Sequence, residues 1–481
     1  MLIYSQKITL LKLITPDNNQ HEHKNSFFLF IPLAVIPQIA KAAVIPATPA
    51  TFDAKMPYLL PGDILQLAAG TYTTPLTING LNGTASKPIV IMGAGNSTIF
   101  NANACCNTIS LRKSSYIVIK NIKLDGLNIN GPDGIKAEGN TVSNPNWTHH
   151  ITIENLTIVN YANNQQQVGI STKCPSSNWI IKNNSIDGAG TGMYLGNSDG
   201  TQPFVNGIIE NNFIQNTIGY NLEVKHQING QRDLAEGVKA GTNLSGKTIL
   251  RNNVFSKAKN SSTGEKNARP NVLVGGFPTT GTGKNDYYEV YGNFFYNNPV
   301  EALFQGTGNV MLYSNIFVNH ANPADFRTVY IAPHNGVSPQ NVKIFHNTLW
   351  SNTSAGGIRI HNPDVNYQQY IYGNVAFLPV ASTAITASNT TTTLLSDNIT
   401  DSYANAGNYV ISATSDLNTL NLYPKVGQLK GILATPHTLF ITNTAYDKDF
   451  NNDAYDWTYR GAYSGSGVNN GWKLTLAKKK Q

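Results

Sequence analysis

Short runs of alternating apolar and polar residues recur along the chain, and most reach an asparagine followed by further apolar positions. Clear copies are IVIKNIKLDG (117–126), WIIKNNSIDG (179–188), GIIENNFIQN (207–216) and YEVYGNFFYN (288–297). Between them lies a second series, which includes GMYLGN (192–197), YNLEVKHQ (220–227) and GIRIHN (357–362). Alternation with a period of two is typical of strands with one buried face. Two short strands therefore recur roughly every 20 to 40 residues, which predicts a repeat architecture with almost no helix.

The recurring asparagine decides between two all-β architectures. Short alternating strands with turn-rich links also suit a β-sandwich, but a sandwich needs no sequence repeat. In a solenoid each strand lies about 4.8 Å from its equivalent in the next coil, so an asparagine at one corner can bond to the next coil's corner. We therefore predict a right-handed, single-stranded parallel β-helix with terminal caps. The expected ladder comprises Asn184, Asn212, Asn253, Asn293, Asn315, Asn347 and Asn374.

The ends of the chain differ from the repeats. Residues 1–42 are typical of a signal peptide, with an apolar stretch at 27–40 before Ala40-Lys41-Ala42. The stretch is short for a membrane span and contains two prolines, although an uncleaved anchor is the alternative. We expect the β-helix with its N-terminal cap at 43–378, and the final coils and a capping segment at 379–481. An exported leader predicts a secreted or periplasmic protein, which we expect to be a monomer without a stable membrane span once the leader is removed.

The composition of the chain limits the classes of molecule that it can be expected to bind. Only 13% of the 481 residues are charged, and the formal net charge is +7. Loss of residues 1–42, with four lysines and two acidic residues, would leave +5. This mild excess suits an acidic polymer, whereas the arginine-rich helix or basic-aromatic alternation that nucleic acid would require is missing from the sequence. Among the three cysteines, the adjacent Cys105 and Cys106 are an unfavourable pair; a bridge from one of them to Cys174 stays open, and we interpret all three as buried small residues.

The strand at 220–227 carries the best candidate chemistry. With Leu222 and Val224 inward, Glu223 and Lys225 face outward from the same strand. Neighbouring coils should bring further groups to them, and Gly275-Gly276 should leave open space beside Lys225. The result would be a shallow cationic groove for an extended acidic polysaccharide. The candidate catalytic residues are Lys225, Arg269, Tyr194 and His226, and the candidate substrate-binding residues are Lys173, Glu223, Glu301 and Gln305.

For a uronate polymer this set suggests β-elimination. A cation must neutralise the carboxylate, a base must remove the C5 proton, and an acid must protonate the leaving oxygen. Lys225 can be the base only if its pKa is lowered, to which Lys173 and Arg269 would contribute and which Glu223 would oppose. Tyr194 suits either a proton donor or a platform for a sugar ring. Glycoside hydrolysis by Glu223 and Glu301 is a weaker hypothesis, because Glu301 lies far along its strand.

Three segments resemble known β-helix proteins. PGDILQLAAGTYTTPLTING (61–80) and GTASKPIVIMGAG (83–95) resemble the opening of secreted proteins of the pectate-lyase-like superfamily, including polysaccharide lyase family 6, and residues 447–463 resemble a bacterial β-helix closing segment. The family's base follows a valine, as Lys225 follows Val224. Its partner arginine is replaced here by the run Val274-Gly275-Gly276. Its calcium-binding carboxylates fall at Tyr220 and Ile218, so the resemblance implies neither a metal nor another cofactor.

Two further activities fit the same residues. A uronate C5-epimerase also removes the C5 proton, and a non-catalytic carbohydrate-binding or adhesion protein needs only the groove. A second group, Tyr330, His334, Arg359 and His361, offers two histidines but no third metal ligand at suitable spacing. We interpret that group as ordinary exposed residues.

Overall fold

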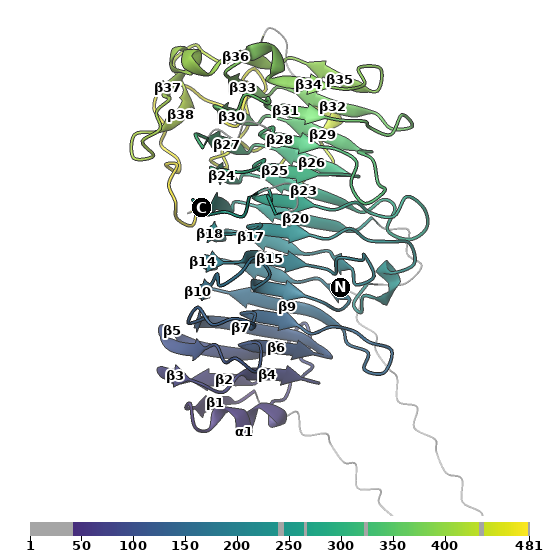
Figure 1. Ribbon diagram of the computed structural model, residues 1–481, viewed down its shortest axis with the longest axis vertical. Coiled ribbons are helices and arrows are strands. Elements are labelled where there is room, and N and C mark those ends of the chain that lie inside the picture. The colour runs from purple at the N-terminus through teal and green to yellow at the C-terminus, as the bar shows by residue number, and fades with distance from the viewer. Residues whose placement is uncertain (1–41, 239–244, 264–266, 322–325, 432–436, 480–481) are drawn as a thin grey trace, which may run out of the picture. The chain divides into compact units, whose positions relative to one another are not determined.

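The strands of each coil lie on three stacks of parallel strands (Figure 1). The computed structural model describes residues 42–238, 245–263, 267–321, 326–431 and 437–479. The expected leader thus lies outside the described residues, apart from Ala42. Because consecutive parallel strands are joined by right-handed crossovers, the chain forms a right-handed parallel β-helix, as the repeats predict.

Each complete coil contributes one strand to each stack. The first stack contains β1 (Val44–Ala47), β2 (Ile64–Leu67), the first parts of β5 (Ile89–Asn101) and β7 (Ser114–Asp125), β9 (Thr148–Glu154), β13 (Ile180–Lys182), β17 (Ile208–Glu210), β20 (Lys247–Arg251), β23 (Tyr287–Tyr291), β26 (Val310–Tyr313), β29 (Val342–Phe345), β32 (Gln369–Tyr372) and β35 (Thr393–Ser396), with β12 (Ser176–Ser177) and β16 (Phe204–Val205) beside it. The second contains β3 (Gly70–Tyr72), the later parts of β5 and β7, β10 (Thr157–Tyr161), β14 (Ser185–Ala189), β18 (Phe213–Thr217), β21 (Val254–Lys257), β24 (Phe294–Tyr296), β27 (Ile316–Asn319), β30 (Thr348–Ser351), β33 (Val375–Leu378) and β36 (Ile399–Ser402). The third contains β4 (Leu76–Asn79), β6 (Ile109–Arg112), β8 (Ile135–Ala137), β11 (Val168–Thr172), β15 (Thr191–Leu195), β19 (Leu222–Val224), β22 (Val272–Val274), β25 (Phe304–Gly306), β28 (Val329–Ile331), β31 (Ile358–Ile360) and β34 (Ile385–Ala387).

The count of strands per coil corrects the sequence interpretation. Two strands per coil were expected, but the apolar positions after each asparagine form a strand of their own. In WIIKNNSIDG, β13 and β14 are separated only by Asn183 and Asn184. Asn183 takes a positive φ of 59°, a conformation that asparagine tolerates, and it turns the chain within two residues. The short turn made two strands read as one.

The asparagine ladder is confirmed. From Asn212 onward, the side-chain oxygen accepts bonds from the backbone N–H and the side-chain amide of the previous asparagine; Asn253 Oδ1 accepts both from Asn212 at 3.0 Å. The oxygen of Asn184, the first member, accepts a bond from Leu156 N. The amide group of Asn253 donates to Ile209 O at 2.9 Å and to Asn293 Oδ1 at 3.0 Å. All seven predicted members take part, and Asn398 continues the ladder beyond Asn374. Stacked coils therefore share a continuous buried amide column.

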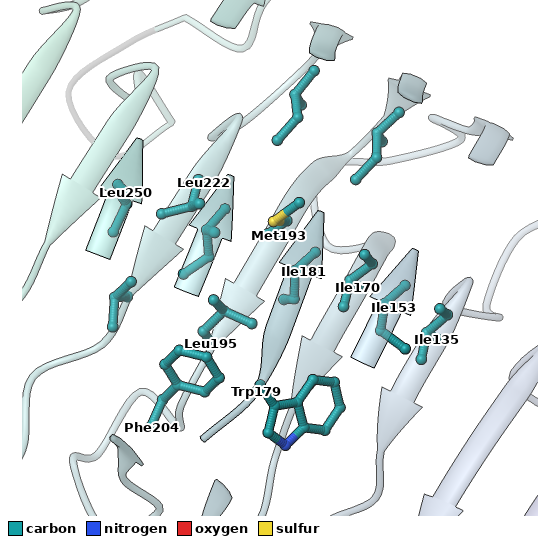
Figure 2. Close-up of a cluster of buried hydrophobic side chains, with 14 of the residues drawn as sticks. Ile135, Ile153, Ile170, Trp179, Ile181, Met193, Leu195, Phe204, Leu222 and Leu250 are labelled. Atoms are coloured by element: carbon teal, nitrogen blue, oxygen red, sulfur yellow. The ribbon is translucent and has the colours of Figure 1, made fainter. Parts of the chain in front are cut away.

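The interior holds the inward positions of all three stacks. Ile135, Ile170, Met193 and Leu222 are fully buried, and they follow one another along the third stack. Figure 2 shows these side chains beside Ile153, Ile181 and Leu250 of the first stack, with Trp179 and Phe204 at the corner. Because the same alternation that buries these residues directs their neighbours outward, the core fixes which side chains the outer face presents.

The helices are short and, apart from Arg232–Leu234 between β19 and β20, lie toward the two ends of the described chain. Helix α1 (Phe52–Lys55) lies next to β1, and Phe52 packs edge-on against Tyr72 and Phe100. The 3₁₀ helices are Met56–Tyr58, Arg232–Leu234, Ala381–Thr383, Tyr403–Asn408 and His437–Leu439. Strands β37 (Val410–Ser412) and β38 (Asn421–Pro424) form an antiparallel pair. None of the helices among the described residues has the length and hydrophobicity needed to cross a bilayer.

The last segment of the chain runs back along the outside of the stacks. Phe440 stacks on Phe345 with ring centroids 4.0 Å apart, and Tyr455 stacks on His346 at 3.9 Å. The C-terminal end reaches the middle of the stack (Figure 1), where Lys479 Nζ donates to Gly292 O at 3.0 Å. Strands β34 to β36 continue the three stacks after residue 379, whereas residues 437–479 contact the sides of earlier coils.

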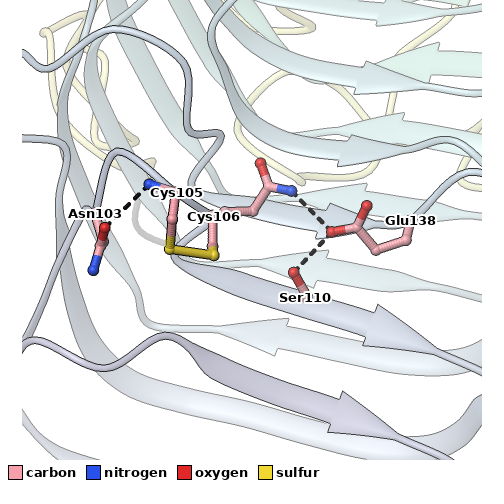
Figure 3. Close-up of a disulfide and its surroundings, with 6 residues drawn as sticks. Asn103, Cys105, Cys106, Ser110 and Glu138 are labelled. Carbon is pink, nitrogen blue, oxygen red and sulfur yellow. Dashed lines mark hydrogen bonds between the residues drawn. A yellow bond between two sulfur atoms is a disulfide. The ribbon is translucent and has the colours of Figure 1, made fainter.

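The cysteines pair differently from the expectation. Cys105 and Cys106 form a disulfide at a turn, where Asn103 Oδ1 accepts a bond from Cys105 N at 3.1 Å (Figure 3). Cys174 is fully buried and unpaired, and burial raises the pKa of its thiol to about 12. The bridge to Cys174 that we had left open is therefore absent. Cys174 alone is the buried small residue that we had expected of all three.

Candidate functional site on the third stack

The candidate residues come together because the third stack keeps strict register over its central coils. Ser171, Tyr194, Glu223, Leu273 and Gln305 are successive partners on β11, β15, β19, β22 and β25. Tyr194 therefore lies between Ser171 and Glu223, as the alternation predicted. Lys173 and Lys225 follow the ends of β11 and β19, where their backbone N–H groups still bond to the neighbouring coil.

Glu223 and Lys225 form a close ion pair. The distance from Lys225 Nζ to Glu223 Oε1 is 2.7 Å, and the side chains are 13% and 2% exposed, respectively. Burial raises the pKa of Glu223, although Lys225 opposes the effect. Burial acts to lower the pKa of Lys225, but the Glu223 carboxylate outweighs it and raises that pKa above the usual lysine value. In the free protein Lys225 is thus held in its charged form, which is the opposite of what a base requires.

Tyr194 lies beside two ammonium groups. Lys173 Nζ is 3.5 Å from the centre of the Tyr194 ring, and Lys225 Nζ is 5.3 Å from it. Burial lowers the pKa of Lys173 to about 8, helped by the positive charges of Lys136 and Lys225. Burial also raises the pKa of the Tyr194 hydroxyl, and the Glu223 carboxylate adds to this effect. The phenol therefore keeps its proton and is a possible donor.

A second, more buried cluster lies one to two coils further along, around Glu301. Its carboxylate oxygen Oε1 accepts bonds from Gln305 Nε2 at 2.8 Å and from Ala302 N at 2.9 Å. Burial raises the pKa of Glu301 to about 7, against the opposing charges of Lys257 and Arg269. Glu301 thus holds the side chain of Gln305.

Lys257, at the end of β21, is a member of this cluster that the sequence analysis did not identify. It is 6% exposed, and burial lowers its pKa to about 7. Lys257 Nζ donates to Arg269 O at 2.9 Å, while the Arg269 guanidinium lies 5.6 Å from the Tyr220 ring. The repeat TILRNNVFSK aligns Lys257 with the exposed Asn216, whereas a register shift in the structure pairs Lys257 with the buried Thr217, so the sequence carried no signal of its burial.

The two glycines beside the site do not leave open space, which corrects the expectation. A Cβ atom at Gly275 would lie 2.3 Å from the backbone nitrogen of His226, and one at Gly276 would lie 2.7 Å from Val337 Cβ. These glycines let coils approach closely. His226 itself contacts the amide of Asn335, which belongs to a loop three coils further along. The described residues contain no group of three or more potential metal ligands among His, Cys, Asp and Glu.

Comparisons with known proteins return structural likeness without sequence likeness. No family model and no curated protein matches the chain. Among solved structures, an alginate lyase of polysaccharide lyase family 6, AlyGC, is 13% identical with a TM-score of 0.45; the match covers 74% of this chain and 51% of that one. The A-module of the mannuronan C-5 epimerase AlgE6 from Azotobacter vinelandii is 14% identical with a TM-score of 0.46, over 73% of this chain and 93% of that one.

Pectate lyase Pel9A is similar over more of this chain. It is 13% identical with a TM-score of 0.46, and the match covers 89% of this chain and 97% of that one. The chain spans about half the length of the alginate lyase that it matches. The activities named are those of the neighbours. What is shown of the present chain is its architecture, a parallel β-helix.

Proposed function

We propose that the protein acts outside the cytoplasm on an acidic, uronate-containing polysaccharide, as a lyase that cleaves by β-elimination. The observation that carries this proposal is the convergence of Lys173, Tyr194 and Lys225, from three successive coils, on one outer face. A cation, a protonated phenol and an amine are the three kinds of group that β-elimination requires.

Lys173 is the cation in this proposal. With a pKa of about 8 it carries its charge at neutral pH, yet it is largely withdrawn from water. A charge in such surroundings interacts strongly with an opposite charge. Pairing with the substrate carboxylate would withdraw electron density from C5 and make its proton more acidic.

Lys225 is the base, and Glu223 is the group that accepts the proton Lys225 must first lose. Burial favours the uncharged form of each residue, and in the free protein the Glu223 carboxylate outweighs it at Lys225. A polymer covering the pair would remove more water and strengthen both effects. The proton would then pass to Glu223, and the free amine would take the C5 proton. The electron pair of the broken C5–H bond forms the C4=C5 double bond, and the C4–O bond breaks. Tyr194 protonates the leaving oxygen.

A non-catalytic polysaccharide-binding protein is the second candidate, and the ion pair between Glu223 and Lys225 favours it. That pair holds Lys225 protonated in the free protein. Gly275, moreover, stands where the lyase family's pattern has an arginine. A C5-epimerase would share proton removal and would differ only in returning a proton to C5.

Incubation of the purified chain with alginate, pectate and glycosaminoglycans tests the proposal. A lyase generates ultraviolet absorbance from the new double bond. Lys225→Ala and Lys173→Ala should each abolish most of it, whereas Lys182→Ala, which removes a charge paired with Glu154 on the first stack, should not. A change in polymer composition without new absorbance would indicate an epimerase. Retardation in an affinity gel without either change would indicate a binder. Full turnover in Lys225→Ala would refute the assignment of the base.

A further inference from the structure

Another cluster of cationic and aromatic side chains, separate from the one around Glu301, lies on the outer face of the third stack, near its far end. Tyr330 on β28 and Arg359 on β31 are register partners. The Arg327 guanidinium carbon is 5.8 Å from the centre of the Tyr330 ring, and the His361 ring stacks on the same ring with centroids 5.9 Å apart. Arg359 Nη2 lies 3.5 Å from His361 Nδ1. Arg327 and His361 thus lie against the Tyr330 ring, and the Arg359 guanidinium lies beside His361.

The positive groups of this cluster repel one another. Among the described residues, Arg327 and Arg359 take part in no ion pair. Burial lowers the pKa of Arg327, and so does the charge of Arg359. Burial and both arginines lower the pKa of His361. Mutual repulsion of this kind is relieved by a bound anion, and paired guanidinium groups match the geometry of a carboxylate.

The strands between this cluster and the Lys225 site keep register from coil to coil. Glu223, Leu273, Gln305, Tyr330 and Arg359 are successive partners on five coils. A cavity of about 140 Å³ lies along this path, lined by Leu273, Gln305, Gly306, Tyr330, Ala332, Pro333 and His334. At about 4.8 Å per coil, the path from Glu223 to Arg359 is about 19 Å long.

We propose that Arg327, Tyr330, Arg359 and His361 form a distal subsite for a carboxylate-bearing sugar, and that the polymer lies along the stack from Lys225 to this subsite. The inference rests on the proposed function and adds the direction and reach of substrate binding. The arginines hold a uronate carboxylate, and the Tyr330 ring packs against the apolar face of a sugar. Only a chain long enough to span about 19 Å gains from both sites at once.

The test measures binding of size-fractionated oligouronates and of the intact polymer to the full chain, by calorimetry at low salt. The double variant Arg327→Gln/Arg359→Gln should bind the polymer about tenfold more weakly, which corresponds to a modest loss of binding free energy. Oligomers too short to span the path should bind the double variant with the same affinity as they bind the unaltered protein. Lysine in place of glutamine at position 359 should restore part of the affinity that the double variant loses. Lys182→Gln is the control for loss of a positive charge on another face.

The outcomes separate this inference from the proposed function. Equal losses for short and long chains, or no loss in the double variant, would overturn the distal subsite while leaving the Lys225 site intact. A carboxyl-reduced polymer should show no effect of the double variant, and an effect that persists would overturn the assignment to carboxylates. If the protein binds no uronate polymer at all, both proposals are refuted. If it binds a sulfated glycan without uronate instead, the anion is sulfate.

Discussion

Replacement of Asn253, in the middle of the asparagine ladder, tests how the coils are held in register. Asn253 is fully buried, and its amide group donates to Ile209 O and Asn293 Oδ1. Asn253→Asp keeps the accepting oxygen but replaces the amide NH2 with a second oxygen, so both donated bonds are lost. The variant also aims a carboxylate oxygen at two other oxygens. An unmade buried hydrogen bond costs about 1–3 kcal/mol, so we expect a loss of about 3–5 kcal/mol in the free energy of unfolding.

The pH dependence of this loss distinguishes the ladder from general disturbance. The buried aspartate has a raised pKa, so it is protonated on mild acidification and regains one donor. Asn253→Asp should therefore recover part of its stability relative to the unaltered protein as the pH falls, whereas Asn253→Leu should not. Asn389→Asp is a matched control, because the Asn389 side chain only accepts bonds, from the N–H groups of Thr391 and Thr392.

Hydrogen exchange followed by mass spectrometry is the assay, because a solenoid can open locally without unfolding as a whole. The backbone N–H of Asn212, which donates to Asn253 Oδ1, should exchange faster in Asn253→Leu than in the unaltered protein. Urea unfolding gives the accompanying change in stability. Unchanged protection of Asn212 together with a stability loss below about 0.5 kcal/mol would refute the ladder as a source of stability.

Three further predictions follow from buried charges and packing. Lys173 has a pKa of about 8, so binding of a uronate polymer should weaken as the pH rises through 8, and Lys173→Arg should move that loss to higher pH because arginine stays charged; an unchanged profile would remove Lys173 from the binding role. Burial raises the pKa of Glu301 from 4.5 to about 7, so between these pH values the folded state binds a proton that the unfolded state does not. The protein should therefore lose stability relative to Glu301→Gln as the pH rises from 4.5 to 7. A constant difference in melting temperature over that range would contradict this prediction. Phe52→Ala should cost about 3–5 kcal/mol, because Phe52 is 1% exposed and packs against Tyr72 and Phe100; a loss below 1 kcal/mol in urea unfolding would show that helix α1 does not secure the end of the stack.

The repeating parts of the fold were predictable from the sequence. An asparagine at one corner and apolar residues at inward positions recur in every central coil, so the ladder and the pairing of Tyr194 with Glu223 followed from counting. The third strand of each coil was missed because the turn at Asn183 takes only two residues. A turn that needs no glycine or proline leaves little trace in the pattern.

The details of the candidate site were less predictable. A glycine in a strand indicates either open space or close approach of backbones, and only the structure shows that Gly275 meets the backbone of His226. The burial of the Glu223 and Lys225 pair depends on neighbours from other coils, and so does the low exposure of Lys257. Residues 437–479 have no periodicity that could reveal their position along the outside of the stacks.

The central claim is that Lys173 and Lys225, more than 50 positions apart in the sequence, act on one sugar as parts of one site. A double-mutant cycle on polyuronate turnover, with Lys173→Ala, Lys225→Ala and the double variant, tests it most directly. The account predicts that the double variant is scarcely slower than Lys225→Ala alone, because a cation that acidifies the C5 proton has no use without the base. Independent losses that multiply, or turnover that neither substitution affects, would contradict it.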